Sequence, residues 1–269
     1  MKRSTCAAVM ASAADRGTGA RRLAGGSSEM QARCGQGWAG VYGQVRGQRL
    51  ASAGDESIGR EQQGADREDS KRDRETGGPG QRGATQLGVS ADDYPVSCPN
   101  NGQGCADIYA VSISGVIPSS RILWFQAQQA CFNARKRLPS NAEWQGAVAG
   151  TPDPGPDNGT TDCNTDSVHA AVNTGLRSAC VSRFGAFDMV GNLGEWVADL
   201  VPRSINCGSW SISDDAQCLQ GVITSGLTEP GAIVRGFGFA SPVAAGPFAI
   251  QGAFQPSESG SALGFRCAR

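Results

Sequence analysis

The cysteines are the residues whose number and spacing most restrict the chemistry of this sequence. Of its ten cysteines, eight fall after residue 90, namely Cys98, Cys105, Cys131, Cys163, Cys180, Cys207, Cys218 and Cys267. The chain has no Cys-x-x-Cys pair and a single histidine, His169, so zinc sites built from cysteine and histidine have little support. An even number of cysteines instead favours disulfides, which place the domain outside a reducing cytosol.

Two oxygen-bearing side chains lie together in the motif Gly-Asn-Leu-Gly-Glu-Trp at 191–196. The oxygens of Asn192 and Glu195 are ligands of the kind that calcium prefers. The alternative for the same residues is a turn held by hydrogen bonds without metal. Calcium is the one cofactor that the residues suggest. His169 is not accompanied by a Gly-x-Ser-x-Gly motif, so a serine nucleophile has no support either.

Composition divides the chain in two. Leu, Ile, Val and Phe make up 8 of the first 90 residues, well below the roughly 20% at which folding becomes doubtful, whereas all nine Phe lie between Phe125 and Phe265. We therefore expect residues 1–92 to be a low-complexity extension, either disordered or translated from a mis-assigned start codon. Residues 93–269 form one domain in this interpretation. The basic, alanine-rich start from Lys2 to Ala14 is a weak candidate for an export signal.

Charge and hydropathy exclude two classes of partner. The chain carries 24 Lys and Arg against 25 Asp and Glu, without the clustered basic face that nucleic-acid binding needs. No apolar run approaches the roughly 18 residues of a transmembrane helix.

Hydrophobic spacing predicts an α+β domain. Trp124, Ala127, Cys131 and Ala134 form one helical stripe, which Lys136-Arg137 closes, and Pro139-Ser140 opens a second helix that ends at Gly150. The stretch 151–166, rich in Pro, Gly and Asp, is expected to be a long loop. Short strands are predicted at 108–117, 186–190, 195–199, 233–235 and 264–267.

Four motifs in fixed order resemble the formylglycine-generating, or sulfatase-modifying factor, family. They are the helical stretch 124–150 with Arg-Leu-Pro-Ser-x-x-Glu-Trp, the stretch 184–200, Val-Arg-Gly-Phe-Gly-Phe at 234–239, and the Gly-Phe-Arg-Cys end. The resemblance covers about residues 108–269 and implies a variant of the C-type lectin fold, with two helices and short irregular strands. It also implies calcium at Asn192 and Glu195, although Gly194 replaces the usual tryptophan.

The resemblance also bears on the disulfides. Cys131 and Cys267 match a disulfide of the family. This leaves Cys98 with Cys105, Cys163 with Cys180, and Cys207 with Cys218 as local pairs, a connectivity that sequence alone does not fix.

The residues that carry the family's chemistry are missing. The oxidase members hold copper(I) with two thiolates that closely follow the third motif, and here 236–266 contains no cysteine. Iron-dependent members need a histidine cluster, and this chain has one histidine. We therefore expect a non-catalytic ligand-binding domain. The alternatives are a formylglycine-generating oxidase acting on a sulfatase cysteine and a structural envelope component.

The segment 237–262 is the predicted binding surface for a protein or glycan ligand, because aromatic residues are scattered there among many small ones. The candidate contacts are Phe237, Phe239, Ser241, Phe248, Gln251, Phe254, Gln255 and Glu258. The alternative is that these phenylalanines are core residues. A mixed segment before a Gly-Phe-Arg-Cys end also resembles the variable proteins of diversity-generating retroelements. The sequence leaves the oligomeric state open.

Overall fold

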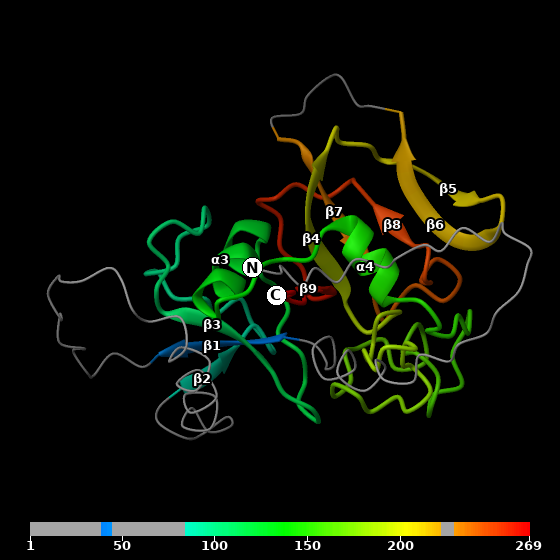
Figure 1. Ribbon diagram of the computed structural model, residues 1–269, viewed down its shortest axis with the longest axis horizontal. Coiled ribbons are helices and arrows are strands. Elements are labelled where there is room, and N and C mark those ends of the chain that lie inside the picture. The colour runs from blue at the N-terminus through cyan, green and yellow to red at the C-terminus, as the bar shows by residue number, and fades with distance from the viewer. Residues whose placement is uncertain (1–38, 45–83, 222–228) are drawn as a thin grey trace, which may run out of the picture.

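The computed structural model describes residues 39–44, 84–221 and 229–269, which form two sheets and two helices (Figure 1). The smaller sheet is antiparallel, in the order β2-β1-β3. Its strands are β1 (Ala39–Gln44), β2 (Ala84–Leu87) and β3 (Ile108–Ser112). β1 and β2 fall within 1–92, the range expected to be an extension. Most of that range lies outside the described residues, so the division at residue 92 stays a prediction.

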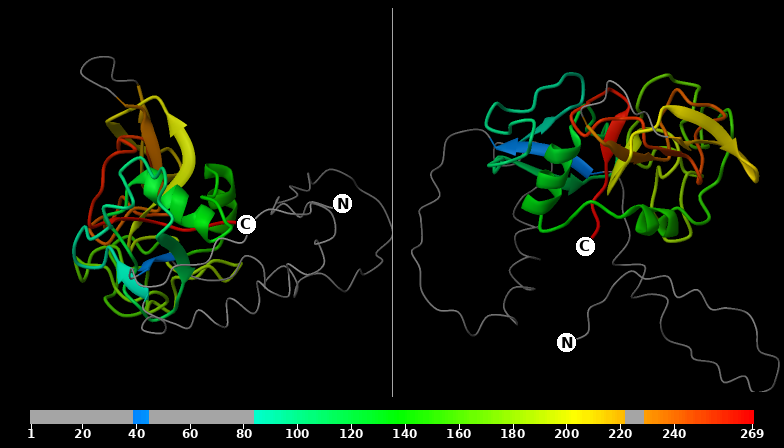
Figure 2. Two further views of the ribbon diagram at one scale, coloured as in Figure 1. Left: turned by 90° about the vertical axis from the view of Figure 1, so that its left-hand side faces the viewer. Right: turned by 90° about the horizontal axis from the view of Figure 1, so that it is seen from above.

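The larger sheet has the order β5-β6-β8-β7-β4-β9. Its strands are β4 (Gly194–Val201), β5 (Asn206–Trp210), β6 (Ser213–Gln220), β7 (Gly231–Arg235), β8 (Ile250–Gln251) and β9 (Leu263–Phe265). β4 pairs antiparallel with β7 and parallel with β9. Figure 2 shows the two sheets side by side, with the β5–β6 hairpin at the outer edge of the larger one.

Both predicted helices are confirmed. α3 (Trp124–Asn133) buries the predicted stripe of Trp124, Ala127 and Cys131. α4 (Asn141–Ala147) begins with a reciprocal cap, in which Glu143 N donates to Ser140 Oγ and Ser140 N donates to Glu143 Oε2. The Arg137 guanidinium, together with Ser140, lowers the pKa of Glu143 to about 2. Among the described residues, no helix is both long and apolar enough to cross a membrane.

The strand predictions at 195–199 and 233–235 are confirmed, and β3 and β9 overlap two others. The predicted strand at 186–190 is wrong, because Asp188 has a φ of +55° and this stretch makes only an isolated bridge between Val181 and Phe187. The β5–β6 hairpin was not predicted. Its residues are mostly polar and exposed, which removes the apolar alternation that marks a strand.

Two buried clusters form the core. One surrounds α3 and contains Trp124, Trp196 and Phe265. The other lies between α4 and the larger sheet and contains Trp144 and Ile233. Because β4 supplies Trp196 to the first cluster and Val197 to the second, the two cores share this strand.

Four disulfides within residues 84–221 and 229–269 stabilise this α+β fold. Cys131 on α3 is bonded to Cys267 just after β9, across 136 residues. The other three close short loops and join Cys98 to Cys105, Cys163 to Cys180, and Cys207 to Cys218. These are the pairs named from the sequence.

We expect the long-range disulfide to contribute most to stability. In the chain-entropy model, the C131A/C267A variant loses about 5 kcal/mol of unfolding free energy, whereas C98A/C105A, which opens a much shorter loop, loses about 2.5 kcal/mol. Urea unfolding under non-reducing conditions measures both, with a thiol titration to verify that the remaining disulfides have formed. Equal losses for the two variants would contradict this ranking.

Candidate functional site

A buried carboxylate, Glu195 on β4, joins motifs from distant parts of the chain. Its Oε2 accepts hydrogen bonds from Trp144 Nε1 (2.6 Å) and from Arg266 Nε (2.5 Å), and its Oε1 accepts one from Arg266 Nη2. Arg266 also donates to the carbonyl oxygen of Phe187 at 3.2 Å. Burial raises the pKa of the Glu195 carboxyl, and the Arg266 and Trp144 hydrogen bonds oppose that rise.

Both polar atoms of the Asn192 side chain are also hydrogen-bonded. Its Oδ1 accepts hydrogen bonds from Val172 N (2.9 Å) and Asn164 Nδ2 (3.2 Å), and its Nδ2 donates to Val172 O (3.1 Å). With both Glu195 oxygens bound to Arg266, a cation would meet a guanidinium at this point. Asn192 and Glu195 therefore do not fit a calcium site, and the hydrogen-bonded alternative describes them.

Arg235, at the end of β7, fastens the C-terminal segment to α4. Its guanidinium carbon lies 4.4 Å from the centre of the Trp144 ring, and its side chain is 2% exposed. Nη1 donates to Ala249 O (2.8 Å) and Nη2 donates to Gln145 Oε1. Burial lowers the pKa of Arg235 to about 10, which leaves it charged near neutral pH. Nη2 also donates to Pro247 O (3.3 Å), so Arg235 holds the backbone on either side of Phe248 in place.

β8 divides the predicted binding segment into a first loop (236–249) and a second loop (252–262). Phe237, Phe239, Ser241 and Phe248 lie in the first loop, Gln251 in β8, and Phe254, Gln255 and Glu258 in the second loop. The first loop contacts a different part of the domain from the second. Ser241 N donates to Thr165 O, whereas Trp124 N donates to Pro256 O. The two loops are therefore supported by different parts of the domain.

The phenylalanines also differ in exposure. Phe248 is 40% exposed. Phe237 packs against the Trp144 cluster, and Phe254 meets Trp196 edge-on, with ring centres 6.1 Å apart. Phe239 is half-buried. Of the four, Phe248 is the one whose ring is displayed, and the core alternative holds for Phe237 and Phe254.

The remaining polar candidates are partly exposed. Gln251 pairs with Val234 of β7 and Cys218 of β6, and Glu258 accepts a hydrogen bond from Arg203 at 3.3 Å. Ser241 and Gln255 are half-buried.

Trp210, at the end of β5, is a surface residue that the sequence analysis missed. Its ring is 41% exposed, and its Nε1 donates to Phe248 O at 2.9 Å. The signal that marks it is a tryptophan inside a short span closed by Cys207 and Cys218, since such a hairpin has no core in which to bury so large a ring. Trp210 and Phe248 together are called the aromatic pair below.

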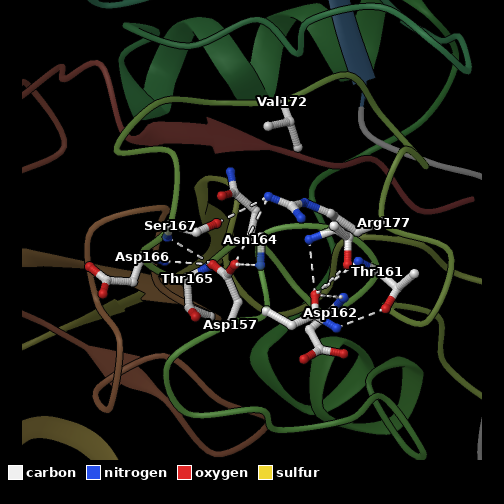
Figure 3. Close-up of polar contacts among 12 residues, drawn as sticks. Asp157, Thr161, Asp162, Asn164, Thr165, Asp166, Ser167, Val172 and Arg177 are labelled. Carbon is white, nitrogen blue, oxygen red and sulfur yellow. Dashed lines mark hydrogen bonds and ion pairs between the residues drawn. The ribbon is translucent and has the colours of Figure 1, made fainter.

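Polar contacts fix the long loop after α4 (Figure 3), and this loop is hydrogen-bonded to the first loop through Thr165 and Ser241. Its centre is Asp157, whose carboxylate accepts hydrogen bonds from the amides of Gly159 (2.7 Å), Thr165 (2.8 Å), Asp166 (2.8 Å) and Ser167 (3.1 Å). Although burial raises it, these hydrogen bonds hold the pKa of Asp157 well below its usual range. Arg177 lies 4.0 Å from the same carboxylate. These contacts fix the loop, and its Thr165 carbonyl accepts the hydrogen bond from Ser241 N.

These features define a disulfide-stabilised α+β domain in which the sequence motifs meet at one buried ion pair. The chain belongs to the sulfatase-modifying factor family, because residues 82–269 match the profile described as Sulfatase-modifying factor enzyme 1-like domain. The C-type-lectin-like fold expected for this family is thereby confirmed. No curated protein matches the sequence.

Similar solved structures include the Major Tropism Determinant P3c variant, at 20% identity over 67% of this chain and 47% of that chain, with a TM-score of 0.39. CarF is 15% identical over 63% of this chain and 69% of its own, with a TM-score of 0.35. The Treponema denticola variable protein 1 is 17% identical over 56% and 70%, with a TM-score of 0.34. The chain spans about half the length of the tropism determinant that it matches (47%).

We expect the buried ion pair, rather than a metal, to hold the Gly191–Trp196 turn. Glu195→Gln leaves Arg266 without its counter-charge and lowers the free energy of unfolding by about 3 kcal/mol. The matched control is Glu258→Gln at the partly exposed pair with Arg203, for which we expect a loss below about 1 kcal/mol. Urea unfolding measures both variants, and similar small losses would contradict a structural role for Glu195.

Proposed function

We propose that this chain is a non-catalytic member of its family that binds a protein or glycan ligand through the aromatic pair and the first loop. The observation that carries the proposal is that Trp210 and Phe248, from segments far apart in sequence, lie together and are each about two-fifths exposed (41% and 40%). Tyrosine- and tryptophan-type rings supply large contact areas with few rotatable bonds, which is why such rings dominate binding surfaces.

The backbone of the first loop is fixed without use of the displayed ring. Phe248 N donates to Asp215 Oδ2 at 2.6 Å, and Phe248 O accepts from Trp210 Nε1 and from Arg235 Nη1 (3.4 Å). A backbone held in this way loses little conformational freedom on binding, so more of the contact energy of the ring is available for affinity.

The state of the cysteines favours binding over the oxidase alternative. Copper(I) needs thiolates, and each of the eight cysteines between residues 84 and 221 or 229 and 269 is in a disulfide. Disulfides of this number persist in oxidising compartments, which supports a location outside the cytosol.

The test is retention of the full chain on a glycan array and on immobilised cell-surface proteins. We expect reproducible binding to at least one ligand. Phe248→Ala should weaken that binding by about tenfold or more, because it removes the displayed ring and leaves the three backbone hydrogen bonds. The matched control is Phe132→Ala, which removes a 71% exposed ring on α3 and should leave binding unchanged. Equal losses in both variants, or no retained ligand, would count against the proposal.

The same arrangement supports a second proposal, that the first and second loops are diversified. They lie between β7 and β9, whose described residues are all buried, so variation there leaves the scaffold intact. We expect the gene to be flanked by a near-copy of the codons for 236–267 beside a reverse-transcriptase gene. Sequencing the flanking DNA checks this, and a flank without such a copy would mean a fixed surface.

A further inference from the structure

Three carboxylates gather at the edge of the aromatic pair. Asp153 follows α4, and Asp214 and Asp215 lie on β6. One oxygen from each lies within 4.8 Å of the others. Asp153 and Asp214 are exposed, whereas Asp215 is completely buried (0%). None of the three takes part in an ion pair with any residue that the structure describes.

Besides the gathering of carboxylates, the environment of the buried Asp215 side chain also points to a ligand. Its Oδ2 accepts the hydrogen bond from Phe248 N, but its Oδ1 accepts none from the described part of the chain. Gly246 allows this carboxylate to sit where it does, since a Cβ on Gly246 would lie 1.8 Å from Asp215 Oδ1. A buried charged oxygen without a partner carries a large desolvation penalty, so this position calls for an electropositive group.

The repulsion between the carboxylates affects the pKa of Asp153. Burial, and then the neighbouring charge of Asp215, raise the pKa of Asp153 to about 6. The charge of Asp215 also acts on the buried Arg235 guanidinium, where burial lowers the pKa of Arg235 and this charge raises it.

We propose that Asp153, Asp214 and Asp215 bind a calcium ion. Carboxylate oxygens are the ligands that calcium prefers, its variable coordination number suits two exposed residues and one buried one, and water completes the shell. The site is separate from Asn192 and Glu195, whose oxygens are already engaged.

Calcium at this position would act on the proposed binding surface. It would join the start of the long loop after α4 to β6, and it would hold the carboxylate that fixes Phe248 N. This consequence rests on the proposed function, but binding of the ion does not. Calcium binding without any retained ligand would therefore overturn only the proposed function.

The test is titration of the full chain with calcium chloride alone, followed by calorimetry and by the thermal midpoint of unfolding. Near neutral pH we expect one calcium per chain and a higher midpoint in millimolar calcium. Asp214→Asn should weaken calcium binding by about tenfold or more, because it removes an exposed ligand. Asp153→Asn provides a second variant at a surface position, so the test does not depend on changing the buried Asp215.

Two controls make the test specific. Asp162→Asn removes a carboxylate elsewhere on the long loop and should bind calcium as the unchanged chain does, as should Glu195→Gln. No calcium-dependent shift, or a shift that Asp153→Asn and Asp214→Asn both retain, would overturn the proposal.

Discussion

The domain depends on the neutralisation of one buried carboxylate. Glu195 is 1% exposed, and a charge in that position is stable only with a partner and hydrogen bonds. Trp144 comes to it from α4, and Arg266 comes to it because β9 runs parallel beside β4. The docking of α4 and the addition of the last strand are therefore linked to the same carboxylate.

A second constraint follows from the position of Arg266 in the chain. The next residue, Cys267, is bonded to Cys131 of α3. The strand that completes the larger sheet is thus tied on one side to the Glu195 network and on the other to the helix that covers the first core cluster. The position of the first loop depends on the same network, because Arg235 lies over the Trp144 ring and donates a hydrogen bond to Ala249 O in that loop.

Features set by local signals could be predicted from the sequence. The Ser140 to Glu143 cap and the stripe of Trp124, Ala127 and Cys131 are such signals, and both helices are where they were expected. The prediction of a strand at 186–190 was wrong because a short apolar run in the sequence does not indicate that Asp188 has a positive φ. The roles of Asn192 and Glu195 could not be decided, since the same oxygens suit calcium and hydrogen bonds until their donors are known. Asp153 and Asp215 come together only through the tertiary fold.

The Glu195–Arg266 pair also links early and late parts of the chain during synthesis. The two residues are 71 positions apart, so Glu195 emerges from the ribosome long before its counter-charge does. Burial of Trp144 and Glu195 in that interval would leave an unpaired charge in the interior. The final packing of α4 against β4 is therefore stabilised only when Arg266, close to Cys267, has joined the sheet with β9.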